Sequence, residues 1–393
     1  MGYEVHIDWA GGTAFSGTAD DVTGYLRSID ISRGRDQAFS VAVPAGAATI
    51  ELVDTAGRFN PAAPASGITM RPNLPVRIRY VQASGGTVLP LFRGYLRKVT
   101  HTPRGGPEAG RTVLECEDLF RVMAGWDGRR EESFTPWTAG SAIEDYLTNY
   151  IGYGLQSVTV SGGEISLDVS VGADQVVDGL TLIGEIVQAE GGDFYVNGGG
   201  TVVYRTLMQR LTASVAGTVT DTAAGVQPTM DLDRVTNRQE AGQEADVTRS
   251  ADNTASIAVY GVQRDATIVN KYLMGTAGAL STAEYIVSTQ GTADVPVERV
   301  RLTAGWAGTA ELGSTFQTMT RRDIGDRIRL IDTPSRLGTV DVFIERVTHH
   351  IEEGVHTTEW GVTPYPKLGT AGTAWTPFQF GVSTLDGTHI LVT

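Results

Sequence analysis

The chain has 393 residues, 41% hydrophobic and 19% charged, which is enough to build cores for two to four domains of roughly 100–200 residues. Its net charge of −14 argues against a surface that grips nucleic-acid phosphates or an anionic membrane, and its single cysteine excludes an internal disulfide framework and multi-cysteine metal sites. The N-terminal residues lack the pattern of a secretory signal, and no apolar run approaches the ~18 residues that span a bilayer.

Short alternating apolar and polar runs, bounded by Gly, Pro and Asp, dominate the chain, and this pattern is typical of a β-rich protein. The clearest predicted strands are residues 76–81, 112–116 and 342–347. In the first of them, Arg77 and Arg79 alternate with apolar side chains, so one face of the strand is predicted to meet a core and the other to meet water.

Helical patterns are few and lie mostly in the middle of the chain. A capping box at Ser141, followed by apolar residues at three- and four-residue spacing, predicts a first helix. A second helix is predicted over residues 178–190, with glycines after its end, and a third over residues 281–289, with Ser281 as its cap. The glycine-rich run at residues 197–200, between two apolar segments, predicts a β-hairpin.

A strand pattern is repeated near the two ends of the chain. Residues 73–80 resemble residues 323–330, and residues 95–101 resemble residues 343–349, with offsets of 250 and 248 residues. A turn and a further strand follow in both copies. Chance likeness between two hairpins explains this less well than duplication does, because both order and spacing are kept.

The repeat predicts a mainly β protein with a smaller α+β part. We expect a first β-barrel, or split-barrel, domain in residues 1–122 and a middle α+β domain in residues 123–232. A second, similar β-barrel domain is expected in residues 233–365, with room for a helical insertion near residues 281–290. Residues 366–393 are predicted to be a linker and a short C-terminal segment.

Common catalytic and nucleotide-binding motifs are not found in the sequence: there is no P-loop, no G-x-S-x-G elbow, no H-E-x-x-H and no G-x-G-x-x-G. Cys116 is flanked by carboxylates that would raise the pKa of its thiol, so a buried strand residue is favoured over a nucleophile. The six tryptophans are scattered, which favours packing over a sugar-binding platform. Paired carboxylates for glycoside hydrolysis remain open on composition alone.

Two segments resemble metal sites. The densest group combines histidines and glutamates, and its turn would bring His350 and His356 across a hairpin; His349 and His350 point to opposite strand faces, so a solvated hairpin tip is favoured over zinc. Residues 54–61 are acidic, but interrupted by Thr, Arg and Phe, so we predict a turn with Gly57 at positive φ and a buried phenylalanine instead of a calcium loop. No catalytic, cofactor-binding or metal-binding residue is assigned, and no cofactor is expected.

Further short segments, none of them specific alone, form an ordered series along the chain. They are residues 28–35, 48–61, 71–79, 91–96, 191–195, 233–238, 256–261 and 323–328. As an ordered set, spread through about residues 20–365, this series resembles the tail-hub proteins of long-tailed phages, often called minor tail proteins.

The resemblance implies a hub fold like that of contractile-phage baseplate hubs, in which two similar barrels are separated by an α+β domain and three subunits form a ring. Six similar barrels would join a sixfold tail tube to a threefold tip. The implied partners are further copies of the chain (a homotrimer), the tail tube or distal tail protein, and tail fibre or tip proteins. Genomic DNA would pass through the lumen without specific binding, and no membrane insertion by this chain is expected.

The implied location is the distal end of the tail of a siphophage-like virion, with the protein made in the host cytoplasm. Some family members carry an appended peptidoglycan hydrolase or receptor-binding region, for which we expect no room here, so the chain is predicted not to be an enzyme. Another tail-tip or distal-tail subunit, a glycan-binding adsorption module, and the hub of a related injection or gene-transfer particle remain alternatives. Two barrel copies favour the hub over a distal-tail subunit.

Overall fold

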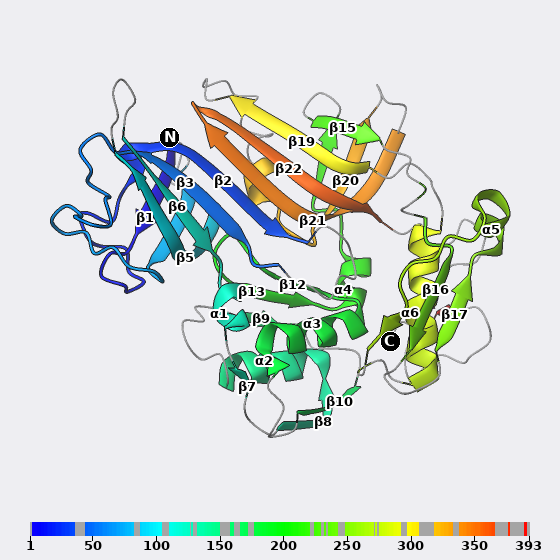
Figure 1. The fold of residues 1–393 in the computed structure, drawn as a ribbon. Coiled ribbons are helices and arrows are strands. Elements are labelled where there is room, and N and C mark those ends of the chain that lie inside the picture. The colour runs from blue at the N-terminus through cyan, green and yellow to red at the C-terminus, as the bar shows by residue number, and fades with distance from the viewer. Residues whose placement is uncertain are drawn as a thin grey trace.

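The computed structural model describes most of the chain. The described residues are 2–35, 44–81, 87–103, 110–125, 127–128, 132–149, 158–160, 166–171, 177–220, 224–228, 232, 235–242, 248–270, 272, 275–291, 297–305, 318–332, 338–365, 376–377 and 389–390. The fold is mainly β, as predicted, with few helices (Figure 1). Its main feature is a curled 12-stranded sheet that spans the upper part of Figure 1.

The N-terminal half of this sheet contains six strands, each antiparallel to its neighbours. In spatial order they are β1 (Gly2–Ile7), β4 (Pro75–Val81), β5 (Val88–Thr102), β6 (Arg111–Glu117), β3 (Ala47–Val53) and β2 (Leu26–Gly34). Buried and less buried residues alternate along most of these strands, so one face of the sheet packs on a core that includes Ile29, Ile50, Ile78 and Phe92.

The C-terminal half contains six more strands in the equivalent order. They are β14 (Gly217–Thr220), β20 (Arg327–Asp332), β21 (Gly338–Glu352), β22 (Val355–Pro364), β19 (Val297–Gly305) and β15 (Ala224–Pro228). The one difference is that β14 runs parallel to β20, whereas β1 runs antiparallel to β4. The second half has its own core, centred on residues such as Val300, Ile328 and Trp360.

The duplication extends to an irregularity in the longest strands. Both β5 and β21 are 15 residues long. The register of β5 against β6 shifts between Leu96 and Lys98, and that of β21 against β22 shifts between Ile344 and Arg346. These positions are equivalent in the sequence repeat, so each copy has its bulge in the same place. The strands predicted at residues 76–81, 112–116 and 342–347 are confirmed as parts of β4, β6 and β21.

The two copies are joined edge to edge. Strand β2 pairs antiparallel with the second part of β21, from Ser28 opposite Glu352 to Gly34 opposite Arg346. Among the described residues the strands of both copies therefore form one sheet, and not two separate sheets: β20 and β14 branch at β21 from a single path that runs from β1 to β15. The sequence pattern alone does not reveal this, because an alternating strand carries no mark of which neighbour it pairs with.

Below the sheet in Figure 1 lies a middle α+β unit. Its elements are α1 (Phe120–Ala124), β7 (Asp127–Gly128), β8 (Glu132–Thr138), α2 (Ala139–Asn149), β9 (Val158–Val160), β10 (Ser166–Val171), β11 (Val177–Asp178), α3 (Gly179–Glu190), β12 (Asp193–Val196), β13 (Val202–Arg205) and α4 (Leu207–Thr212). The predicted second helix is confirmed as α3, which ends at Glu190 and is followed by Gly191 with φ 68°. The predicted hairpin is confirmed as β12–β13.

The predicted first helix is present, but the predicted cap is wrong. Helix α2 begins at Ala139, and the hydroxyl of Thr138 accepts a hydrogen bond from the backbone N–H of Ser141 at 3.2 Å. Ser141 therefore lies in the first turn, and Thr138 caps it. Thr138 is also the last residue of β8, so the sequence pattern assigns it to the strand and hides its role as a helix cap.

A small outer unit is inserted between β15 and β19. It consists of β16 (Arg238–Gly242), β17 (Arg249–Asp252), α5 (Thr254–Tyr260), β18 (Ile268–Val269) and α6 (Gly275–Gln290). The predicted helical insertion is present, but Ser281 does not cap it, because α6 begins six residues earlier at Gly275. Small residues fill those first turns and give no apolar periodicity.

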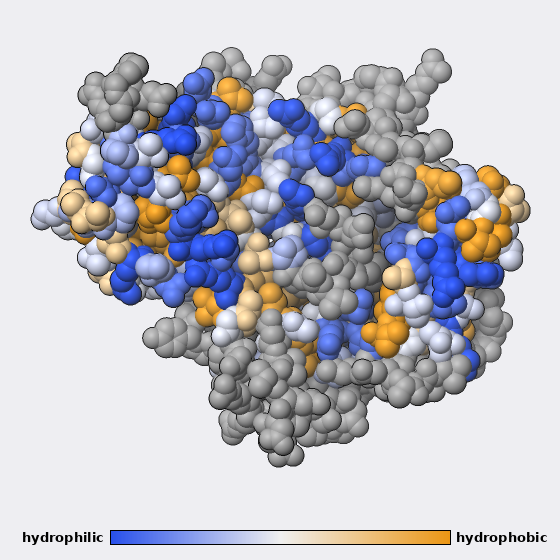
Figure 2. Space-filling model, viewed as in Figure 1, coloured by the Kyte–Doolittle hydropathy of each residue, from blue (hydrophilic) through white to orange (hydrophobic). Residues whose placement is uncertain are grey.

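The outer unit lies at the right of Figure 1 and carries apolar side chains on its surface (Figure 2). Val259, Val269 and Val262 are the most exposed large apolar side chains among the described residues. The remaining elements are η1 (Thr23–Tyr25), β23 (Thr376–Pro377) and β24 (His389–Ile390). Within the described ranges, no helix has the length and apolar character needed to cross a bilayer.

Candidate functional site

The junction between the two sheet halves is the place where distant parts of the chain converge. At the end of β2, Gly34 has φ 99°, and a Cβ on it would lie 2.2 Å from the carbonyl oxygen of Glu345. The next residue, Arg35, donates its backbone N–H to that same oxygen at 3.1 Å. Only glycine allows the backbone of β2 to lie so close to the bulge of β21.

Four buried charged side chains meet behind this contact, and we call them the junction cluster: Arg35, Asp193, Arg210 and Glu345. They come from the end of β2, from β12, from α4 and from β21. The Arg35 guanidinium lies 2.8 Å from a carboxylate oxygen of Asp193 and 3.2 Å from one of Glu345. Arg210 also pairs with both carboxylates, so two positive charges balance two negative ones.

The cluster is almost completely removed from water. The side chains of Asp193 and Glu345 are 2% exposed, that of Arg210 is 5% exposed and that of Arg35 is 10% exposed. Thr363 of β22 donates a further hydrogen bond to Glu345 at 2.6 Å. Because a buried charge without a partner is strongly unfavourable, these residues can be buried only together, and they tie the sheet halves to the middle unit.

The electrostatics of Glu345 follow from this arrangement. Burial alone would raise the pKa of its carboxyl group, but Arg210 and Arg35 outweigh burial and lower that pKa to about 2. Glu345 is therefore ionised over the whole range in which the protein would normally be handled.

The depressed pKa predicts a specific loss of stability in acid. Its folded-state value of about 2 lies below the ordinary value of 4.5, so its contribution is fully present above about pH 4.5 and is lost as the pH falls towards 2. We expect the difference in free energy of unfolding between the wild type and Glu345→Gln to shrink when measured at about pH 3 instead of about pH 5.5. A difference that does not change with pH would contradict the assignment.

A second contact extends the junction towards β20. Arg33 donates to Asp323 at 2.9 Å and to the carbonyl oxygen of Val196 at 3.1 Å. The other oxygen of Asp323 accepts from the backbone N–H of Gly198 at 3.3 Å. The predicted glycine-rich turn therefore positions a hairpin tip against both sheet halves.

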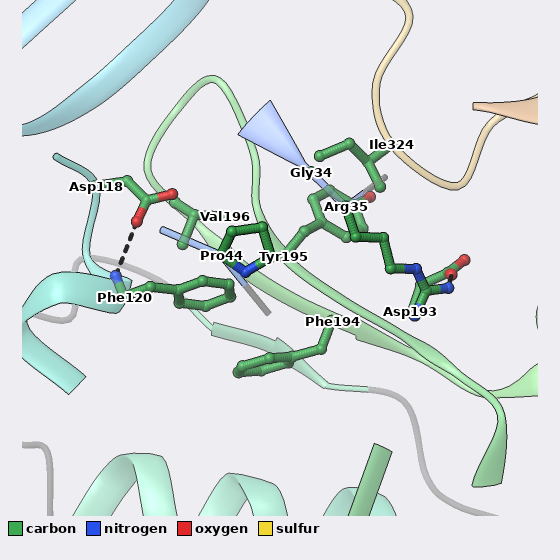
Figure 3. Close-up of a pocket in the computed structure, with 10 residues that line it drawn as sticks. All are labelled: Gly34, Arg35, Pro44, Asp118, Phe120, Asp193, Phe194, Tyr195, Val196 and Ile324. Atoms are coloured by element: carbon green, nitrogen blue, oxygen red, sulfur yellow. Dashed lines mark hydrogen bonds and ion pairs between the residues drawn. The ribbon is translucent and has the colours of Figure 1, made fainter. Parts of the chain in front are cut away.

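A small cavity lies beside these contacts, lined by Arg35, Asp118, Phe120 and Asp193 among others (Figure 3). Its volume is about 10 Å³, which is no more than one water molecule occupies. Asp118 accepts hydrogen bonds from the backbone N–H groups of Gly46 at 2.8 Å and Phe120 at 2.9 Å, and burial raises its pKa to about 7. The cavity is a packing gap and is too small for a substrate.

The histidine-rich hairpin differs from the expectation in two respects: it is not a solvated tip, because His349 and His356 are buried, and a different pair of histidines meets. His349 and His356 are the pair that meets, with 3.0 Å between Nδ1 and Nε2, and His350 lies on the other face of the sheet beside Asp30. Burial lowers the pKa of His356 to about 3 and that of His349 well below its usual value, so both are neutral. The expectation placed His356 beside His350, but His356 opposes Ile351 in the register. His349 is two residues from Ile351, so it lies on the same face as His356 and is its diagonal neighbour.

The other singled-out residues have structural roles. Cys116 is buried in β6, and burial together with its neighbouring glutamates raises its thiol pKa. Asp54 accepts from the backbone N–H groups of Arg58 and Phe59, Gly57 has φ 68°, and Phe59 is fully buried, so the predicted turn is confirmed. In the described part of the chain, no three His, Cys, Asp or Glu side chains are placed to hold a metal ion.

The junction cluster was not identified from the sequence. A usable signal was present in Glu345, a charged residue inside the apolar run Val342–Val347, and in the charged segment that surrounds Gly34. Arg210 gave no comparable signal, because an arginine in a short helix is ordinarily exposed.

Solved structures of known proteins share this fold. The 43 kDa tail protein of prophage MuSo2 from Shewanella oneidensis has a TM-score of 0.62 at 14% identity, covering 93% of this chain and 99% of that one. The tail protein from Neisseria meningitidis MC58 has a TM-score of 0.58 at 12% identity, covering 93% and 97%. A prophage tail protein from Listeria monocytogenes EGD-e has a TM-score of 0.52 at 11% identity, covering 92% and 94%.

At these identities the likeness is one of fold, and it extends over nearly the whole length of each chain. No protein-family model matches the sequence, and a search of curated proteins finds no match.

Proposed function

We propose that this chain is a structural subunit of a phage tail, and that it acts as the tail hub at the distal end of a siphophage-like tail. The observation that carries the proposal is the duplicated strand order joined head to tail in one curled sheet. Two similar units in each chain are what a subunit needs if three copies are to present six similar surfaces. The shared fold with three tail proteins, two of them from prophages, supports a role in a tail.

In this proposal the first tube-forming unit covers residues 1–122 and the second covers residues 233–365, separated by the middle α+β unit. Strands β14 and β15, at residues 217–228, belong to the second unit although they precede residue 233, because they pair with β20 and β19. The outer unit is an insertion in the second copy.

The proposed work of the chain is geometric and requires no catalysis. A ring of three copies would seat the sixfold tail tube on one side and organise a threefold tip on the other. Its partners would be further copies of itself, the tube or distal tail protein, and fibre or tip proteins. The net charge of −14 suits a lumen that lets DNA pass without holding it.

Electron microscopy of the purified protein at high concentration tests this proposal directly. We expect class averages with threefold symmetry, six similar lobes and a central opening. A sample containing tail-tube protein serves as the second condition, since the tube can supply contacts that promote assembly. Isolated monomers under both conditions would overturn the hub and would favour a peripheral role such as glycan binding. A glycan array would then test that role.

A further inference from the structure

The junction between β2 and β21 pairs a strand of the first repeat with a strand of the second repeat. Because the strand order is duplicated, the equivalent strands could form the same pairing between chains. In the shared order, β2 of the first copy is equivalent to β15 of the second, and β5 of the first copy is equivalent to β21 of the second. The chain uses β2 and β21 to join its own two halves. Their equivalents, β15 and β5, are therefore the two strands through which the chain would contact neighbouring chains.

The pairing of the strands agrees with this equivalence. The second part of β21, from Arg346 onwards, has β22 on one side and β2 on the other. The equivalent part of β5, Lys98–Thr102, pairs with β6 alone among the described strands. Strand β15 ends the strand order and pairs with β19 alone in the same part of the structure. Within the described strands, β15 and the Lys98–Thr102 part of β5 thus each lack the partner strand that their equivalents have at the internal junction.

Burial gives a second, independent indication. Val347 of β21 is fully buried, whereas its equivalent Val99 of β5 is only half-buried. Ile29 of β2 is fully buried, whereas its equivalent Val226 of β15 is half-buried. The apolar residues of the two outer edges therefore lack the cover that the same positions have at the internal junction, and that cover is a neighbouring strand.

We propose that β15 of one chain pairs antiparallel with the Lys98–Thr102 part of β5 in the next chain. This contact would repeat, between chains, the pairing of β2 with β21 inside each chain. This inference rests on the proposed function and names the surface through which the ring would form. The contact is head to tail, because one chain contributes β15 of its second repeat and the next chain contributes β5 of its first repeat. Such contacts close into a ring or continue as a filament. Backbone hydrogen bonds along the added strand would supply the contact.

The register between chains follows from the register within the chain. Across the first repeat, Asp30 of β2 lies opposite Thr49 of β3, which lies opposite Glu115 of β6. Glu115 in turn lies opposite Lys98, the first residue after the bulge of β5. Gln227 of β15 connects in the same way to Arg346, the first residue after the bulge of β21.

Asp30 and Gln227 are thus equivalent positions. Since Asp30 opposes His350, which lies four residues after Arg346, Gln227 should oppose the partner's Thr102, which lies four residues after Lys98.

Disulfide cross-linking tests this register. Opposed residues on antiparallel strands have Cβ atoms roughly 4.5–5.5 Å apart, close to the span of a disulfide. The double variant Gln227→Cys with Thr102→Cys, oxidised at high protein concentration, is expected to give covalent dimers and trimers on a denaturing gel, and no larger species. The native Cys116 is buried and should not contribute.

Two matched variants control the experiment. Asp30→Cys with His350→Cys places cysteines at the equivalent positions of the internal junction, where both side chains are about half exposed, and should form a disulfide within each monomer. Gln227→Cys with Val259→Cys combines a cysteine in β15 with one at an exposed position of the outer unit, and it should give no covalent dimers or trimers.

Each outcome bears on the inference or on the function beneath it. Trimers that appear by microscopy without cross-links would overturn the β15–β5 assignment and leave the hub intact. A cross-linked ladder that continues beyond three would support the strand pairing and overturn the threefold ring. Monomers without cross-links, with or without tail-tube protein, would overturn both.

Discussion

Replacing Arg210 with methionine is expected to lower the free energy of unfolding by about 3–5 kcal/mol, the range found when one partner of a buried ion pair is removed. Methionine keeps much of the volume of the arginine side chain but carries no charge. Two buried carboxylates, Asp193 and Glu345, would then share only Arg35. Denaturant unfolding followed by fluorescence measures the change.

The control for this variant is Arg238→Met. Arg238 forms an ion pair with Asp252, but both side chains are more than a third exposed. Surface pairs of this kind contribute little to stability because water and salt screen them, so a much smaller loss is expected than for Arg210→Met. If both variants lost the same small amount of stability, the junction cluster would not be the electrostatic centre that its burial indicates.

Replacing Gly34 with alanine is expected to destabilise the protein by about 2–5 kcal/mol, from a left-handed backbone strain of about 1–2 kcal/mol and a steric overlap of about 1–3 kcal/mol. The added Cβ would lie 2.2 Å from the backbone oxygen of Glu345 and 2.9 Å from the Cα of Arg346. Neither atom belongs to a side chain that could move aside, so β2 and β21 must separate.

Gly24→Ala is the matched control, since its φ is not positive and no atom lies within 4 Å of the added Cβ. Surface changes of this kind stay within about 0.5 kcal/mol. Thermal unfolding and limited proteolysis of both variants give the comparison. A Gly34→Ala protein as stable as the Gly24→Ala protein would contradict the close contact at the junction.

Local sequence patterns determined much of the secondary structure. The strands at β4, β6 and β21, the hairpin at residues 197–200 and helix α3 were predictable, because periodicity and turn chemistry act over a few neighbouring residues. The duplication was also predictable, since the two copies keep similar residues in the same order. Capping was less predictable: at α2 and α6 the first turn begins before the apolar pattern does.

Tertiary structure alone decided how the two copies are connected. The pattern of β2 is that of any half-buried strand, and its pairing with β21 joins residues more than 300 positions apart. The junction cluster depends on the same long-range meeting, because Arg35, Asp193, Arg210 and Glu345 have no local relation in the chain. The residue pattern predicts two similar sets of strands and the elements between them. Which edges meet depends on backbone groups that every residue carries alike, so only the folded sheet determined that choice.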